Sequence, residues 1–415
     1  MFHDRHKTII TLVCLALQGI LFPDPSKAQE KQGAWGIKAG ADRMTIGSFR
    51  DTYKALGFNS YSLEWNHITT PSGKEGSYAE GFNYPVFGIG LNWNTLSDVE
   101  FKSKRGHYDD MFSLYGSISR DLLRTSRLGF GYNIHLGLSY SSGYYDAQTN
   151  SSNWFFSSPV LLYVAGGGHL IWMASPRLDI EADISVRHNS SARLAYPNGG
   201  LNYWGGGLSA RYRFSTKRPP RGNVFKPAAI RDPSNPKGWN LEIYGGGGWH
   251  SCAAEWNAIV KTVPRQDLST SMLHRWPMLS LSADAIYRTG ERFALGFTAD
   301  GFWNSNTERL KWADSVLYEE EEIRSSKGYA PFSGGIGLVQ EVFYKDFALY
   351  IQEGIYLYRH MGVHGEHGPL YERAGIRYYP SALDPVFISV CIKAHKFKAD
   401  YLDFTIGFRL KGHKN

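Results

Sequence analysis

Three polar residues near the middle of the chain have the types and spacing that could do chemistry. His188 and Ser190 are two positions apart, and Asn202 follows a short loop later. Residues i and i+2 of a β-strand share a face, so the imidazole of His188 can approach the hydroxyl of Ser190. A serine hydroxyl is a poor nucleophile until a neighbouring base takes its proton, so this pair is compatible with nucleophilic chemistry.

The segments that carry these residues predict a β-hairpin. Apolar and charged residues alternate along 176–190 without a break, which is the period of a strand with one apolar and one polar face. A second strand is expected over about 201–214, and the apolar parity of the two strands includes His188, Ser190 and Asn202. In a membrane barrel the apolar face meets lipid and the polar face lines the lumen. We therefore expect these three polar residues at the tip of a hairpin, on the outward face.

The N-terminus predicts export. Residues 1–28 contain Arg5 and Lys7, then a mostly apolar run from Thr8 to Phe22, then the small-x-small sequence Ser26-Lys27-Ala28. This order is typical of a secretory signal peptide, so the mature chain is expected to begin at Gln29.

The composition favours an all-β fold, a transmembrane antiparallel β-barrel. After the signal peptide no stretch has 18 consecutive apolar residues, whereas the chain has 45 Gly and 26 Tyr and repeated alternation. A secreted β-sandwich or propeller is the alternative class. The formal charge of +7 indicates no nucleic-acid partner and is compatible with a membrane surface. Cys252 and Cys391 are expected to be free thiols, buried or facing the lumen.

Sixteen strands are predicted, with connections that alternate between short and long. This alternation is typical of a barrel with short periplasmic turns and long outer loops, although the connection at 69–83 is long where a short one is expected. The predicted strands cover 34–41, 59–68, 84–96, 109–121, 127–141, 159–173, 176–190, 201–214, 237–251, 277–289, 291–305, 331–344, 346–358, 370–380, 385–396 and 401–411.

The segment 215–236 divides the strands into two groups of eight. It is rich in Pro and in cations and is expected to be a periplasmic connection between a half at 29–214, which carries the candidate site, and a half at 237–415. One barrel of about 16 strands is the favoured arrangement, and two tandem 8-stranded barrels are the alternative. A wide barrel leaves a lumen, and a narrow one fills it with side chains.

The motif around the candidate site resembles a known family. His188-Asn189-Ser190-Ser191, followed by Pro197-Asn198-Gly199-Gly200, is similar to the signature His-x-Ser-Asn and then Pro-Asn-x-Gly of the outer-membrane lipid A 3-O-deacylases, often labelled acyloxyacyl hydrolases in Bacteroidota. The specific part of the resemblance covers 186–214. It implies an outer-membrane serine esterase of a Gram-negative cell that hydrolyses an acyl ester of lipid A, with lipopolysaccharide and membrane lipid as partners. We expect no cofactor and no metal site.

The resemblance also implies roles for individual residues. Ser190 matches the nucleophile, His188 the general base, and Asn198 an Asn that helps to form the oxyanion hole. Ser191 stands where the family has Asn, a possible second donor, and Asn202 stands where the family has an acid. An Asn oxygen can orient a His but cannot supply charge to an imidazolium, so a slower enzyme is expected.

Each motif also has a structural interpretation. His188 alone is typical of a residue that anchors a strand end at a membrane interface, Ser190 and Ser191 of a loop, and 197–200 of a turn. His395 and Asp403 are expected to face the lumen, because they share the polar parity of their strands. The alternative function is a non-enzymatic barrel, either a channel or a degenerate scaffold.

Overall fold

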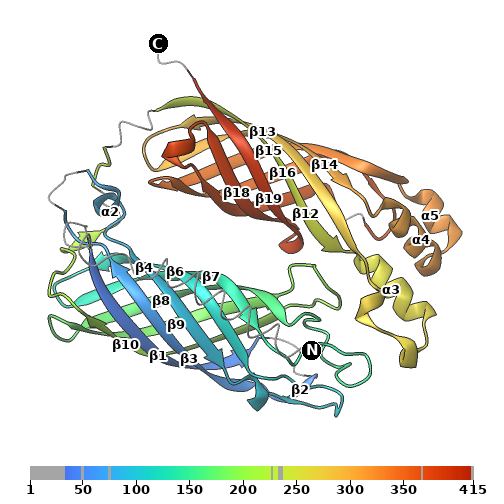
Figure 1. Ribbon diagram of the computed structural model, residues 1–415, viewed down its shortest axis with the longest axis horizontal. Helices are drawn as coiled ribbons and strands as arrows, with labels where there is room; N and C mark the ends of the chain where they lie inside the picture. Colours follow the sequence, from blue (N-terminus) through green and yellow to red (C-terminus); the bar gives the residue numbers. More distant parts are fainter. Residues whose placement is uncertain are drawn as a thin grey trace.

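The computed structural model describes residues 33–47, 51–72, 76–225, 228–231, 237–365 and 368–412. The predicted signal peptide at 1–28 lies outside the described residues, as does part of the 215–236 connection. Figure 1 shows two β-barrels side by side. Among the helices in these ranges, none combines the length and apolar character needed to cross a membrane.

The first barrel is an eight-stranded antiparallel sheet that closes through the pairing of β6 with β7. Around the barrel the order is β1-β10-β9-β8-β7-β6-β4-β3, and the short strand β11 extends β6. The bounds are β1 Ala34–Ile46, β3 Gly57–Ile68, β4 Val86–Asn94, β6 Met111–Arg124, β7 Leu128–Tyr140, β8 Val160–Met173, β9 Leu178–Ser190, β10 Leu201–Arg213 and β11 Gly222–Asn223, with β2 Tyr53–Ala55 paired to β5 Glu100–Phe101 in a separate two-stranded sheet.

The second barrel is closed by the pairing of β12 with β19. Its strands are β12 Gly238–Ser251, β13 Arg275–Arg288, β14 Phe293–Asn304, β15 Tyr329–Tyr344, β16 Phe347–Met361, β17 Leu370–Tyr378, β18 Val386–His395 and β19 Lys398–Lys411. The connections carry α2 Tyr78–Gly81, α3 Ala253–Thr262, α4 Thr307–Leu317 and α5 Glu320–Ser325, and the 3-10 turns η2 Leu96–Asp98, η3 Arg265–Asp267, η4 Thr270–Met272 and η5 Ser381–Leu383.

The prediction of sixteen barrel strands is confirmed, and the favoured single wide barrel is wrong. β10 returns to pair with β1, and β19 returns to pair with β12, so each group of eight strands closes on itself. Alternation of apolar and polar residues is the same in one wide barrel and in two narrow ones, because it reports only which face each residue takes. The alternative of two tandem 8-stranded barrels is the arrangement found.

The outward faces are apolar and the lumens are filled with buried polar side chains. In the first lumen Arg211 pairs with Glu181 at 3.1 Å, and Arg187 pairs with Asp42. In the second lumen fully buried arginines contact several carboxylates: Arg373 Nη2 lies 2.8 Å from Asp403 Oδ2 and Nη1 lies 3.2 Å from Asp300 Oδ1, while Arg377 contacts Glu242, Asp284 and Glu341 at 2.7–2.9 Å. A buried charge must be paired in this way, because desolvation of an unpaired ion is costly.

Two predictions about buried groups are confirmed. His395 and Asp403 lie inside the second barrel, where His395 contacts the Tyr356 hydroxyl at 2.9 Å. Cys252 and Cys391 are both free and buried.

The two barrels contact each other at both ends. We call the ends that carry the long connections and the helices α3, α4 and α5 the loop rim, and the opposite ends the turn rim. At the loop rim Tyr145 of the first barrel packs edge-on against Trp256 of α3, with ring centroids 5.8 Å apart. At the turn rim Arg292 donates to the carbonyl of Gly81 at 3.0 Å. The long connection predicted at 69–83 lies at the turn rim and has a structural use, because its helix α2 and Phe82 contact Tyr344 of the second barrel.

Candidate functional site

The hairpin of β9 and β10 brings two of the predicted site residues together. Asn202 is directly opposite His188 in the register of this pair, and His188 Nδ1 lies 2.7 Å from Asn202 Oδ1. Their neighbours Val186 and Trp204 are 63% and 57% exposed, so this face is the outside of the barrel. The predicted position on the outward face, at the loop rim, is confirmed for His188 and Asn202.

The contact with Asn202 determines which nitrogen of His188 can accept a proton. The amide oxygen accepts a hydrogen bond, so Nδ1 carries the hydrogen and Nε2 has the free lone pair. An imidazole held in this tautomer can act as a base through Nε2. The orienting group is neutral, so it gives direction to the ring but no charge to stabilise the protonated form.

Ser190 lies at the end of β9 and is only 6% exposed. Its Oγ accepts the N–H of Ala192 at 3.5 Å, and among the described residues it shares no hydrogen bond with His188. The structure therefore places Ser190 two residues beyond His188 on the same strand, and no hydrogen bond between the described atoms joins the two side chains. Catalytic hydrogen bonds are often long in the absence of substrate and tighten when it binds.

The loop 191–200 between β9 and β10 holds the other two predicted residues. Asn198 Oδ1 accepts the backbone N–H of Ser191 at 3.0 Å, which leaves the NH₂ group of Asn198 as its donor side. The Ser191 hydroxyl donates to the carbonyl of Ala195 at 3.1 Å. Both donors of Ser191 are thus used within the loop, and Asn198 remains the better candidate donor to an oxyanion.

Two residues make contacts at the site that the sequence did not predict. Gly200 has a φ of 71°, and a Cβ there would lie 2.7 Å from His188 Cε1, so only glycine lets the loop pass this close to the ring. Trp154, in the connection before β8, lies against the same loop, because its carbonyl accepts the N–H of Gly199 at 3.1 Å. The Asn-Gly-Gly sequence was a signal for the turn but not for the close contact with His188.

An apolar row leads across the barrel wall to Ser190. Four residues are matched in register on four neighbouring strands, and all four take the outward parity of their strands: Leu114, Leu138, Leu162 and Ser190. Leu114 and Leu138 also line a groove of about 630 Å³ on the outer face of β3, β4, β6, β7 and β8. The lining of this groove is almost entirely apolar, with aromatic rings from Tyr61, Trp93, Phe112 and Tyr140.

This architecture defines a tandem pair of antiparallel β-barrels with a His–Asn pair on the outer wall of the first. Residues 239–412, which form the second barrel, match the family model described as "Acyloxyacyl hydrolase, C-terminal domain". A search of curated proteins finds no match to the chain.

Solved structures align with part or with nearly all of the chain at low identity. Neisserial surface protein A is 10% identical with a TM-score of 0.28, and the alignment covers 43% of this chain and 97% of that one. The outer membrane enzyme PagL is 11% identical with a TM-score of 0.27, over 42% of this chain and 98% of that one. A COG4313 outer membrane channel from Pseudomonas putida F1 is 10% identical with a TM-score of 0.18, over 94% of this chain and 97% of that one.

Proposed function

We propose that the protein is an outer-membrane lipid A deacylase, a serine esterase that hydrolyses an acyl ester of lipid A at the outer leaflet. The observation that carries the proposal is the 2.7 Å contact of His188 with Asn202 on the outward face, next to Ser190. A polar pair on a lipid-facing wall suits a substrate that is itself a membrane lipid. The match of residues 239–412 to an acyloxyacyl hydrolase family model supports the same class of reaction.

The apolar groove supports a lipid substrate. An acyl chain on the outer wall would meet the row of Leu114, Leu138 and Leu162, which ends in register with Ser190. Transfer of a CH₂ group from water to an apolar site is favourable by about 0.8 kcal/mol. An acyl chain that already lies in lipid does not gain this free energy again, so the groove would bind it by matching its shape. The substrate therefore reaches the site sideways through the membrane, and no pore is required.

The proposed reaction follows from the residue types. His188 Nε2 takes the proton of the Ser190 hydroxyl as Oγ attacks the ester carbonyl carbon, and the NH₂ group of Asn198 donates to the oxyanion that forms. Collapse of the tetrahedral intermediate breaks the ester bond, and the alkoxide of the sugar takes the proton from His188. Water then hydrolyses the acyl group from Ser190 with His188 again as base.

A non-enzymatic scaffold is the second candidate function. It is favoured by Asn202 in place of an acid and by the burial of Ser190 away from His188. A channel has less support, because two cavities between the described polar side chains of the first lumen hold only about 20 Å³ each, little more than one water molecule needs.

Purified protein in detergent distinguishes these functions. With lipid A as substrate, the wild type should release a fatty acid, and Ser190→Ala and His188→Ala should release none while keeping a folded barrel. Activity in Ser190→Ala equal to the wild type would exclude the proposed mechanism. Steady conductance in planar bilayers would favour a channel instead.

A further inference from the structure

The loop that follows Ser190 is held in place by the second barrel. Ser251, at the end of β12, donates its N–H to the carbonyl of Arg193 at 2.6 Å, and its hydroxyl donates to the carbonyl of Leu194 at 3.0 Å. Arg275 Nε donates to the same Leu194 carbonyl at 3.2 Å. Three hydrogen bonds from another barrel thus fix the backbone of the candidate site loop.

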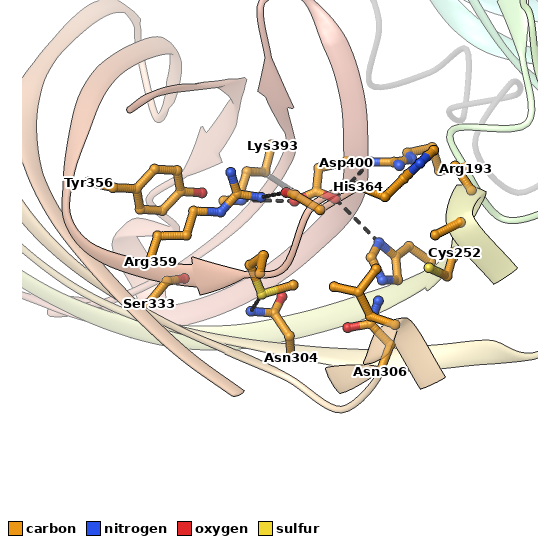
Figure 2. Close-up of a pocket in the computed structure, with 16 residues that line it drawn as sticks. Arg193, Cys252, Asn304, Asn306, Ser333, Tyr356, Arg359, His364, Lys393 and Asp400 are labelled. Atoms are coloured by element: carbon orange, nitrogen blue, oxygen red, sulfur yellow. Dashed lines mark hydrogen bonds and ion pairs between the residues drawn. The ribbon is translucent and has the colours of Figure 1, made fainter. Parts of the chain in front are cut away.

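The side chain of Arg193 makes a further connection between the barrels. Its Nη1 lies 3.0 Å from Asp400 Oδ1 in β19, and its Nε donates to the Tyr196 hydroxyl at 2.9 Å. Asp400 also contacts Lys393 at 2.9 Å, His250 at 3.3 Å and His395 at 3.8 Å, so it is the anion at the centre of four basic side chains. Figure 2 shows Arg193 reaching Asp400 from one side and Lys393 from the other.

The guanidinium has the geometry for this double role. Arg193 presents planar N–H donors in a fixed fork, so one side chain ties the loop to itself through Tyr196 and to the second barrel through Asp400. The ion pair is largely buried, since the two side chains are 14% and 9% exposed. A buried pair of this kind has a strict geometry and is little screened by salt.

The backbone of the loop also requires external support. Ala192 and Arg193 have φ angles of 48° and 62°, in the left-handed region that L-residues rarely adopt. Such conformations persist where the surrounding structure over-determines them. Here that structure includes Ser251 and Asp400 of the second barrel.

We propose that the second barrel is the positioning element of the site in the first barrel, and that Arg193 is the positioning residue that connects them. The inference rests on the proposed function, because the loop it fixes carries Asn198 and Ser191 and directly follows Ser190. Arg193 acts through the loop: it holds the donor side of Asn198 in place beside the ester without contacting the reacting atoms. Separated from the second barrel, the first barrel keeps its strands and loses the ordered loop.

The test compares variants of the full chain in detergent with lipid A as substrate. Arg193→Gly removes the side chain while a glycine accepts the positive φ, so it deletes the connection without adding backbone strain. We expect its kcat to fall by about 10- to 100-fold with KM within about 2-fold, because misplacement by about 1 Å costs this much in rate. Arg193→Lys, which keeps the charge, should restore part of kcat.

A matched control removes a contact between the barrels that does not involve this loop. Gln148 donates to the carbonyls of Arg265 and Gln266 at 2.7 and 2.9 Å, so Gln148→Ala loosens the same interface elsewhere. Its kcat should equal that of the wild type. The comparison requires that Ser190→Ala is inactive. In that case, an unchanged kcat in Arg193→Gly, or an equal loss of kcat in Gln148→Ala, would overturn the proposal.

Limited proteolysis tests the connection without using activity. Trypsin should leave the bond after Arg193 intact in the wild type and cut it in Asp400→Asn. The folding of both proteins is checked by the change in gel migration between unheated and heated samples. Equal cleavage, or equal resistance, would show that Asp400 does not hold the loop. If instead Ser190→Ala is fully active, the proposed reaction fails, and the proteolysis still decides whether the second barrel orders the loop.

Discussion

Replacement of Asn202 by aspartate should make the protein a faster enzyme. The Asn202 oxygen lies 2.7 Å from His188 Nδ1, so a carboxylate at this position keeps the hydrogen bond and adds a negative charge beside the imidazolium that forms in the reaction. The two side chains are nearly the same size, and Asn202 is exposed, so the substitution needs no repacking.

The size of the gain follows from the separation of the two atoms. Two unit charges at this distance attract by about 1.5 kcal/mol even at the dielectric constant of water, and by more in the less polar surroundings of a membrane rim. The imidazole of His188 gains its charge as it takes the proton from Ser190, so the attraction lowers the barrier of that step. About 1.5 kcal/mol corresponds to a rate roughly ten times higher.

The assay is the initial rate of fatty acid release from lipid A by purified Asn202→Asp and by the wild type, compared at the alkaline plateau of each pH profile. Asn202→Ala, which loses the hydrogen bond to the ring, should be slower than the wild type. A rate for Asn202→Asp equal to or below that of the wild type, with His188→Ala inactive, would refute the reasoning that Asn202 takes the place of an acid.

Three other perturbations have defined outcomes. Gly200→Ala places a Cβ 2.7 Å from His188 Cε1, so kcat should fall while urea unfolding shows a loss of stability of only about 1 kcal/mol. Arg373→Met leaves two buried carboxylates without their cation and should lower the unfolding free energy by about 3–5 kcal/mol, whereas Arg324→Ala, which removes an exposed ion pair in α5, should leave it unchanged. Burial raises the pKa of the Cys252 thiol, so maleimide should label this residue more slowly than a free cysteine at pH 7 and reach the same rate only after unfolding.

The strands could be predicted from the sequence because each barrel strand has a buried and an exposed face. In β9 the alternation of Ile184 and Val186 with Ser185 and Arg187 survives intact in the structure. The same parity placed His188 opposite Asn202 on the outward face. The alternation of residues within a strand determines which side chains point inward and which point outward, so the sequence predicts these orientations well.

Closure and loop structure could not be predicted in the same way. Whether β10 pairs with β1 or with a later strand depends on contacts between distant residues, and the pattern within a strand does not report them. The helix α3 and the contact of Arg193 with Asp400 depend on the approach of two barrels, which leaves no periodic signal in a loop. For the same reason the burial of Ser190 was not expected.

The most direct test of the proposed function is mass spectrometry of lipid A from cells that express the wild type or Ser190→Ala. We predict that the wild type removes the mass of one acyl chain and that the variant removes none, with both proteins folded in the outer membrane. Identical lipid A spectra from the two strains, with folding confirmed, would contradict the assignment of Ser190 as the nucleophile and favour a scaffold.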